Sequence, residues 1–245
     1  MVIKRLIKNI FETTRDINEG VSESVTGLKE KIKLAFNSIP KHVAFDIEDG
    51  LGEAKALKEL IFSASKLRIP VMTFNLLKSN HTSQQIDTLV EVLSELLQWQ
   101  YLQENQFKVS VLGRWYNLPA RLVEKIKELV AATKDYDKFF LNLCINYDGQ
   151  EEIVEACKLI AKQVELGRIS PEGITNGTIK EHLWTSYFIP PELIIKVGKA
   201  QSLDGFLLWD SAGARIFFAN KPFGEFTKED FLKAIEWTQK QNKVR

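Results

Sequence analysis

Short apolar runs alternate with amphipathic helical stretches from His42 onward, and this alternation constrains the fold more than any other feature of the sequence. The first unit joins the runs His42–Ile47 and Ile69–Phe74 through a helix that the apolar periodicity predicts over Glu53–Leu67. A helical crossover between two strands places them parallel in one sheet. The pattern therefore indicates an α/β fold.

The rest of the chain repeats the alternation. A nearly all-apolar run, Phe139–Ile145, is typical of a central strand that is covered on both faces. The other predicted strands are Phe107–Leu112, Gly205–Trp209 and Arg215–Phe218. Helices are predicted over Thr82–Gln103, from Pro119, over Gln150–Leu166 and over Thr227–Lys240, with short helical pieces at Ile179–Leu183 and Pro191–Ile195. We expect residues 38–245 to form a single domain, with a central, mostly parallel sheet of about six strands flanked by helices.

Residues 1–37 are predicted to form N-terminal helices that belong to the same domain or contact a membrane or a partner. In Met1–Phe11, apolar residues repeat at helical spacing with Lys4, Arg5 and Lys8 between them. Such a basic amphipathic helix can lie on an anionic membrane surface. Packing on its own domain or on a partner is the favoured interpretation. Because no apolar run approaches the length of a membrane-spanning helix and no signal peptide is visible, we expect a cytoplasmic protein that can also work at the membrane surface.

Several kinds of chemistry have no support in the sequence. The formal net charge of +1 gives no global field for nucleic acid. The three histidines have no metal-ligand spacing, and no phosphate-binding or nucleophile-elbow motif occurs. The two cysteines are interpreted as buried, reduced thiols. Asp46, Glu48 and Asp49 follow the first strand, where carboxylates could hold Mg²⁺, although a solvated loop is the favoured interpretation.

Four segments, in order, carry a resemblance to the cis-prenyltransferases, a family that includes undecaprenyl diphosphate synthase. The segments are Lys41–Ala44, Leu141–Val154 (LNLCINYDGQEEIV), Gly167–Pro171 (GRISP) and Phe206–Trp209 (FLLW). The resemblance covers roughly Pro40 to Trp237. It implies a fold for joining isopentenyl diphosphate to an allylic diphosphate with Mg²⁺. Such a cleft needs arginine forks and a metal ion, because two diphosphates bring several negative charges into it.

The first diphosphate cradle of the family is altered in this chain. The position of the catalytic aspartate falls on Glu48, or on Asp49 if the alignment slips by one residue. The arginine-rich segment that normally follows is missing, because Gly52-Glu53 runs almost directly into the next helix. The arginine that usually follows Asn-Tyr-Gly-Gly is Gln150.

The late diphosphate loop is altered as well. The resemblance implies two arginines and a serine here, and the chain has Lys196, Ser202 and Asp204 at these positions. Arg215 occupies the position of the glutamate that assists the metal ion. A loop that loses cationic forks and gains a carboxylate is expected to hold a diphosphate poorly, since each lost charge-assisted bond costs about 1.5–3 kcal/mol.

This pattern of loss is similar to that of the non-catalytic subunits of heteromeric cis-prenyltransferases, such as the Nogo-B receptor and its yeast counterpart. The segment Ile195–Gly198 resembles the late loop of that branch, and Leu203 and Gly205 also fit it. These subunits dimerise with a catalytic homologue through their late strands and helices, and can complete its active site with an Arg-x-Gly tripeptide at the C-terminus. The sequence ends without that tripeptide, although Lys243 and Arg245 could still reach a partner's phosphate.

Three hypotheses follow. The first is a non-catalytic or weakly catalytic subunit, with no catalytic residues or metal ion of its own expected, in a heterodimer or larger heteromer. Its catalytic partner would bind Mg²⁺ and the isoprenoid diphosphates. The second is an active, divergent, homodimeric enzyme that uses Asp46, Glu48 or Asp49 with Mg²⁺. The third is a lipid- or membrane-binding module. Candidate phosphate ligands are Lys196, Lys199, Lys243 and Arg245, and candidate interface residues are Phe206, Trp209, Arg215 and Phe217.

Overall fold

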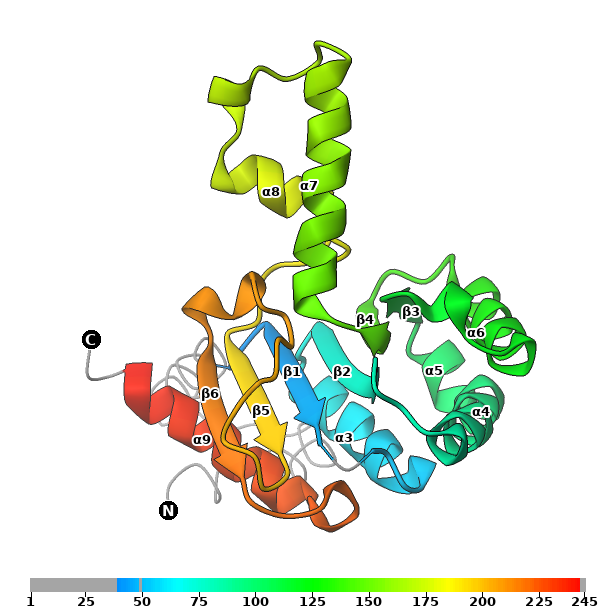
Figure 1. Ribbon diagram of the computed structural model, residues 1–245. Coiled ribbons are helices and arrows are strands. Elements are labelled where there is room, and N and C mark those ends of the chain that lie inside the picture. The colour runs from blue at the N-terminus through cyan, green and yellow to red at the C-terminus, as the bar shows by residue number, and fades with distance from the viewer. Residues whose placement is uncertain (1–38, 49, 243–245) are drawn as a thin grey trace, which may run out of the picture. The chain divides into compact units, whose positions relative to one another are not determined.

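Six strands pair side by side in the order β3-β4-β2-β1-β5-β6 in the computed structural model, which describes residues 39–48 and 50–242. Every neighbouring pair of strands is parallel. The predicted single α/β domain with a central sheet of six strands and flanking helices is therefore confirmed (Figure 1). The N-terminal helices that the sequence predicts over residues 1–37 lie outside the described residues.

The helices and strands follow the alternation of the sequence. The strands are β1 His42–Ile47, β2 Val71–Lys78, β3 Phe107–Leu112, β4 Phe139–Tyr147, β5 Leu193–Val197 and β6 Arg215–Ala219. The α-helices are α3 Ala54–Lys66, α4 Ser83–Gln98, α5 Gln100–Glu104, α6 Ala120–Thr133, α7 Gly149–Glu165, α8 Asn176–His182 and α9 Lys228–Asn242. In this described part of the chain, no helix has the length and apolarity needed to span a membrane.

Two of the predicted late elements are wrong. The segment Pro191–Ile195, predicted to be helical, enters the buried strand β5. The segment Gly205–Trp209, predicted to be a strand, is a turn in which Gly205 has φ +81° and Leu207 has φ +47°. Backbone in the left-handed region cannot continue a strand, so the apolar side chains of this segment are buried from a turn instead.

Smaller differences concern the predicted helix Thr82–Gln103 and the cysteines. The helix is interrupted at Trp99, which has extended backbone with φ −79° and ψ 99° and separates α4 from α5. Both cysteines are free, but only Cys144 is buried, while Cys157 is exposed on α7.

The two faces of the sheet have different chemistry. Phe45 and Phe74 stack on one face with ring centroids 4.6 Å apart, and Phe226 and Phe231 pack against Phe45. The other face mixes apolar and polar side chains, and Phe206 and Leu207 cover part of it. Because side chains alternate along a strand, this second face also carries Asp46, Asn75, Asn142 and Lys196.

The helices of the described domain form two groups. α4 contacts both α3 and α6, and α6 also contacts β3. α7 packs against α8, and Figure 1 shows this pair extending away from the sheet. The chain divides into two compact units, and the sheet with its loops belongs to the unit Pro40–Phe231. The described residues 232–242 belong to the second unit.

His42 joins three segments at the start of β1. Its Nδ1–H donates to the Ile189 carbonyl at 2.6 Å, and its Nε2 lies 2.8 Å from the Thr73 hydroxyl on β2. Asn142 on β4 donates to the same hydroxyl at 3.1 Å. Burial lowers the pKa of His42 to about 4, although the hydrogen bond to Ile189 opposes this effect. His42 is therefore a neutral structural residue.

We expect His42 to make folding sensitive to mild acid. In the unfolded chain a histidine binds a proton near pH 6.5, whereas folded His42 does so only near pH 4. Its contribution is therefore present above pH 6.5 and is lost as the pH falls to 4, a change of about 3 kcal/mol in the free energy of unfolding. Urea unfolding of the wild type and His42→Gln between pH 7 and pH 4 measures it. Parallel pH profiles for the two proteins would contradict this assignment.

Candidate functional site

The carboxyl ends of β1 and β5 meet where the order of the sheet reverses. The chain leaves β1 toward β2 on one side and leaves β5 toward β6 on the other. In open parallel sheets, ligands bind in the crevice outside the carboxyl ends of the strands at such a switch point. The last residues of these two strands therefore define the candidate functional site.

An ion pair lies buried at this switch point. Asp46 of β1 is in register with Lys196 of β5 and with Asn75 of β2. The Lys196 Nζ lies 2.8 Å from Asp46 Oδ2, and Asn75 Nδ2 donates to Asp46 Oδ1 at 2.9 Å. The side chains of Asp46 and Lys196 are both 0% exposed. The row Asn75–Asp46–Lys196 thus crosses three neighbouring strands and closes the base of the crevice.

This arrangement is an argument against Lys196 as a phosphate ligand. A fully buried ammonium group that is already bonded to a carboxylate offers no free charge to a second anion. Desolvation of a buried pair costs several kcal/mol per ion, and leaving one partner unpaired costs about 3–5 kcal/mol. The sequence placed Lys196 in a polar loop because its position within β5 was not recognised.

Glu48, at the catalytic aspartate position of the resemblance, ties two loops together. Its carboxylate accepts a hydrogen bond from the Ala200 N–H at 2.7 Å, and its own N–H donates to the Val197 carbonyl at 3.0 Å. Gly198 has φ +138°, and a Cβ there would lie 2.2 Å from Glu48 Oε2. The Glu48 side chain is thus packed against the loop after β5, and glycine is required for that approach.

A second lysine–carboxylate pair lies above the buried row. Lys78 Nζ at the end of β2 donates to Asp204 Oδ2 at 3.1 Å, and Lys196 Nζ lies 3.9 Å from the same oxygen. Hydrogen bonds with Ser202 and Lys78 lower the pKa of Asp204. The pKa of Lys78 is raised, since Asp46 and Asp204 outweigh the opposing effect of burial. Both groups are therefore charged, and each lysine of the crevice has a carboxylate neighbour.

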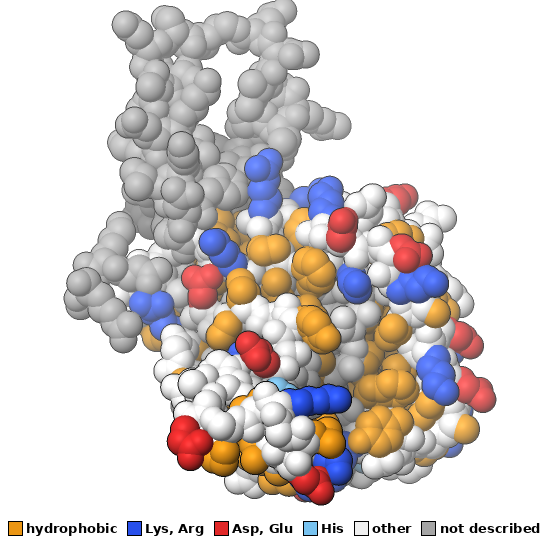
Figure 2. Space-filling model, turned by 90° about the horizontal axis from the view of Figure 1, so that it is seen from above, with side chains coloured by type: hydrophobic (Ala, Val, Ile, Leu, Met, Phe, Trp, Pro, Cys, Tyr) orange, Lys and Arg blue, Asp and Glu red, His pale blue; other side chains and the backbone are white. Residues whose placement is uncertain are grey.

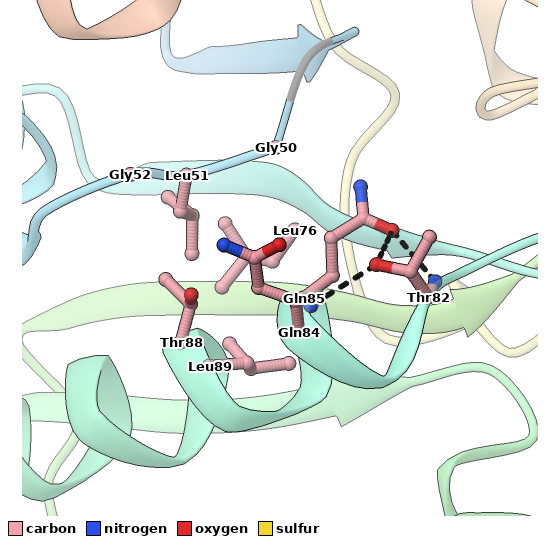
Figure 3. Close-up of a pocket in the computed structure, with 9 residues that line it drawn as sticks. All are labelled: Gly50, Leu51, Gly52, Leu76, Thr82, Gln84, Gln85, Thr88 and Leu89. Carbon is pink, nitrogen blue, oxygen red and sulfur yellow. Dashed lines mark hydrogen bonds between the residues drawn. The ribbon is translucent and has the colours of Figure 1, made fainter.

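The cavity beside the β1–α3 loop has a neutral lining (Figure 3). Its volume is about 340 Å³. Figure 3 shows Gln84 and Thr88 of α4 directed toward the loop Gly50–Gly52, and Gln85 bonded to Thr82. The described residues that line it are Gly50, Leu51, Gly52, Leu76, Thr82, Gln84, Gln85, Thr88 and Leu89. None of these side chains is a cation that could neutralise a diphosphate.

The described carboxylates of the crevice do not fit a magnesium site. Asp46 uses one oxygen for Lys196 and the other for Asn75, while Glu48 accepts a backbone N–H. In the parts of the chain that the structure describes, no group of three or more His, Cys, Asp or Glu side chains is arranged to hold a metal ion. Asp49, the third acidic candidate, lies outside the described residues.

The remaining candidate residues occupy different environments. Lys199 is exposed on the loop after β5, and Lys243 and Arg245 lie outside the described residues. Phe206, an interface candidate, is 1% exposed and packs against the Tyr147 ring, so it supports the fold inside this chain. The other interface candidates, Trp209, Arg215 and Phe217, are partly exposed, and the last two lie on the edge strand β6.

Sequence reasoning missed Lys78 and Asn75. The predicted strand ended at Phe74, whereas β2 continues to Lys78 and places both side chains at the crevice. The sequence offers one signal for Lys78, which is a lysine shortly after an apolar run. Its charged neighbours, Asp46 and Asp204, are far away in the sequence and come close only in the fold.

Comparison with known proteins places this architecture in a family. A family model described as "Putative undecaprenyl diphosphate synthase" matches residues 49–245. The chain belongs to this prenyltransferase family. The match includes β5 and begins just after β1.

Two curated relatives are enzymes of the prenyltransferase family. One is the tritrans,polycis-undecaprenyl-diphosphate synthase (geranylgeranyl-diphosphate specific) of Methanocaldococcus jannaschii, 31% identical over 84% of this chain and 82% of the relative. The other is an isoprenyl transferase of Prochlorococcus marinus subsp. pastoris, 30% identical over 86% and 85%. The solved lavandulyl diphosphate synthase from Lavandula x intermedia, in complex with dimethylallyl diphosphate, has a TM-score of 0.76 and 26% identity over 83% of this chain and 96% of that chain.

The buried pair gives a stability prediction. Lys196→Met leaves Asp46 charged and unpaired in the core, so we expect the free energy of unfolding to fall by about 3–5 kcal/mol. In Asp46→Leu/Lys196→Met both charges are absent, and we expect a smaller loss than in Lys196→Met alone. Urea unfolding of both variants measures the effect.

The exposed pair Lys58–Glu95, with Nζ and Oε2 2.6 Å apart, provides the matched control. Lys58→Met is expected to cost no more than about 1 kcal/mol, because the pair is solvated. An equal loss for Lys196→Met and Lys58→Met would contradict the structural role of the buried pair.

Proposed function

We propose that this chain is a non-catalytic subunit of a heteromeric cis-prenyltransferase. In this proposal a catalytic homologue binds Mg²⁺ and elongates an allylic diphosphate with isopentenyl diphosphate, which leads to a polyprenyl diphosphate. The present chain supplies a family fold and a dimerisation surface. The proposal goes beyond family membership, which the comparisons establish.

The observation that carries the proposal is that the charged groups of the crevice bond to one another and to the protein backbone. Lys196 neutralises Asp46, Lys78 pairs with Asp204, and Glu48 binds the backbone of the late loop. A diphosphate needs several uncommitted cations and a metal ion to replace its hydration shell. Groups that are already committed to one another cannot provide this stabilisation, which supports a role other than catalysis.

Exposed apolar side chains support a partner surface. β6 is an edge strand, on which Phe218 is 38% exposed, and the neighbouring turn exposes Leu208. On α7, Val154 and Leu159 are also exposed. Figure 2, seen from above Figure 1, shows apolar side chains gathered between interspersed charges of both signs. We expect a partner to cover some of these exposed apolar side chains.

The competing function is that of a divergent, Mg²⁺-dependent homodimeric enzyme. Its specific support is the 31% identity with a curated synthase. It requires Asp46, Glu48 or Asp49 to hold the metal ion, and thus requires the described contacts of Asp46 and Glu48 to open. The two accounts differ in the activity that they predict for the isolated chain.

Reconstitution separates these accounts. Labelled isopentenyl diphosphate, Mg²⁺ and an allylic primer are incubated with the pure chain, with a catalytic homologue from the same genome, and with both. We expect no product from the chain alone and at least a tenfold higher rate from the mixture than from the homologue alone, equivalent to about 1.4 kcal/mol in the barrier. Product formation by the pure chain would refute the proposal.

Glu48→Gln tests the same proposal at one residue. Because a glutamine oxygen can accept the Ala200 N–H, we expect the reconstituted rate to stay within about twofold of the wild type. A catalytic carboxylate would instead lose about 100-fold or more when it becomes an amide. The matched control is Glu192→Gln, since the Glu192 carboxylate also accepts a backbone N–H, that of Lys41 at 2.8 Å. A large loss confined to Glu48→Gln would contradict the structural role.

A further inference from the structure

The turn after β5 places a carboxylate inside the crevice. Asp204 has φ +48°, and Gly205 and Leu207 also have positive φ, so the chain reverses sharply over the carboxyl end of the sheet. The turn is held from below, because Leu207 is 1% exposed and a Cβ on Gly149 would lie 2.1 Å from the Gly205 carbonyl. Backbone of this kind persists only where its surroundings enforce it. The packing around the turn therefore fixes the backbone from which the Asp204 side chain extends, and its bond to Lys78 directs the carboxylate.

That carboxylate occupies the position where the two lysines of the crevice converge. Its Oδ2 lies 3.1 Å from Lys78 Nζ and 3.9 Å from Lys196 Nζ. The first distance is that of a charge-assisted hydrogen bond, whereas the second is only that of a neighbouring charge, so Lys78 is the direct partner of Asp204. The Asp204 side chain thus has the charge and the location of a bound anion.

The adjoining cavity would suit a larger anion if this carboxylate were absent. Its volume is about 280 Å³, and its described lining includes Lys78, Ser79 and Asn80. The other carboxylate in the lining, Asp148, accepts the N–H groups of Gln150 and Glu151 at the start of α7. Without Asp204, Lys78 would be left without its direct carboxylate partner at this cavity, while Lys196 would stay paired with the buried Asp46.

We infer that Asp204 is a built-in anion that fills the phosphate position of the crevice and excludes inorganic diphosphate and isoprenoid diphosphates from it. This inference deepens the proposed function and rests on it, because it explains why the crevice of a non-catalytic subunit stays closed to the substrates of its partner. The missing arginines alone would already weaken diphosphate binding. The inference adds a second cause, which is the carboxylate of Asp204.

Removal of the carboxylate tests the inference. Binding of inorganic diphosphate is measured by calorimetry at about 0.1 M salt, where surface attraction is screened. We expect Asp204→Ser and Asp204→Asn to bind diphosphate at least tenfold more tightly than the wild type, as replacing one repulsive neighbour by a charge-assisted bond implies. Asp204→Ser/Lys78→Met should lose this gain. Asp204 is half-exposed, and circular dichroism verifies that each variant is folded.

Glu95→Gln is the matched control, since it removes a carboxylate that pairs with a lysine of the same exposure, 24% for Lys58 and for Lys78, but between α3 and α4. Equal binding by Glu95→Gln, retention of the gain in Asp204→Ser/Lys78→Met, or no gain in either Asp204 variant would overturn the inference. A gain in Asp204→Ser alone would also overturn it, because the charge would then not be the cause. The measurement needs neither a partner nor turnover. A failure here therefore leaves the reconstitution result standing, and a failed reconstitution does not alter the binding result.

Discussion

The buried contact between Asp46 and Lys196 determines what this member of the prenyltransferase family can do. It lies at the switch point of a parallel sheet, where α/β proteins commonly bind their ligands. Two opposite charges without solvent contact stabilise each other only while both are present. Through these contacts Asp46 joins β1 to β5 and to Asn75 of β2. In the proposed function, the charge of the crevice is therefore not available to a substrate. The contacts of Glu48 with the late loop follow from the same closure of the crevice.

The sequence predicts the layout of the domain well and the late part poorly. The strand His42–Ile47 and the strand Phe107–Leu112 have the predicted bounds, because apolar periodicity and flanking turns determine them locally. β5 was missed because Leu193–Val197 contains a lysine, and a charged residue within an apolar run indicates a loop unless its partner is known. That partner, Asp46, lies 150 residues away in the chain. Sequence reasoning also predicted a strand at the FLLW segment, which lies in a turn. Leu207 has a positive φ there, and the backbone of this turn approaches Gly149 closely.

The candidate site was predictable in position but not in its electrostatics. The resemblance placed Glu48, Lys196 and Asp204 near one another, and the structure brings all three to the carboxyl edge of the sheet. It could not indicate that Lys196 is buried, or that Lys78 and Asn75 belong to the same network. Such pairings depend on strand register, and a change of one residue in register would direct each side chain to the opposite face. Family membership therefore establishes the fold, whereas the chemistry follows from the charges that the fold brings together.

The central claim is that the wild-type crevice cannot accept the family's substrate. Equilibrium dialysis of labelled isopentenyl diphosphate against the purified chain, with Mg²⁺ and without a partner, tests it most directly. The account predicts no saturable binding up to millimolar ligand. Saturable binding of one molecule per chain in the micromolar range, lost in a Lys78→Met variant that remains folded, would contradict it and would show that the lysines of the crevice are available to substrate.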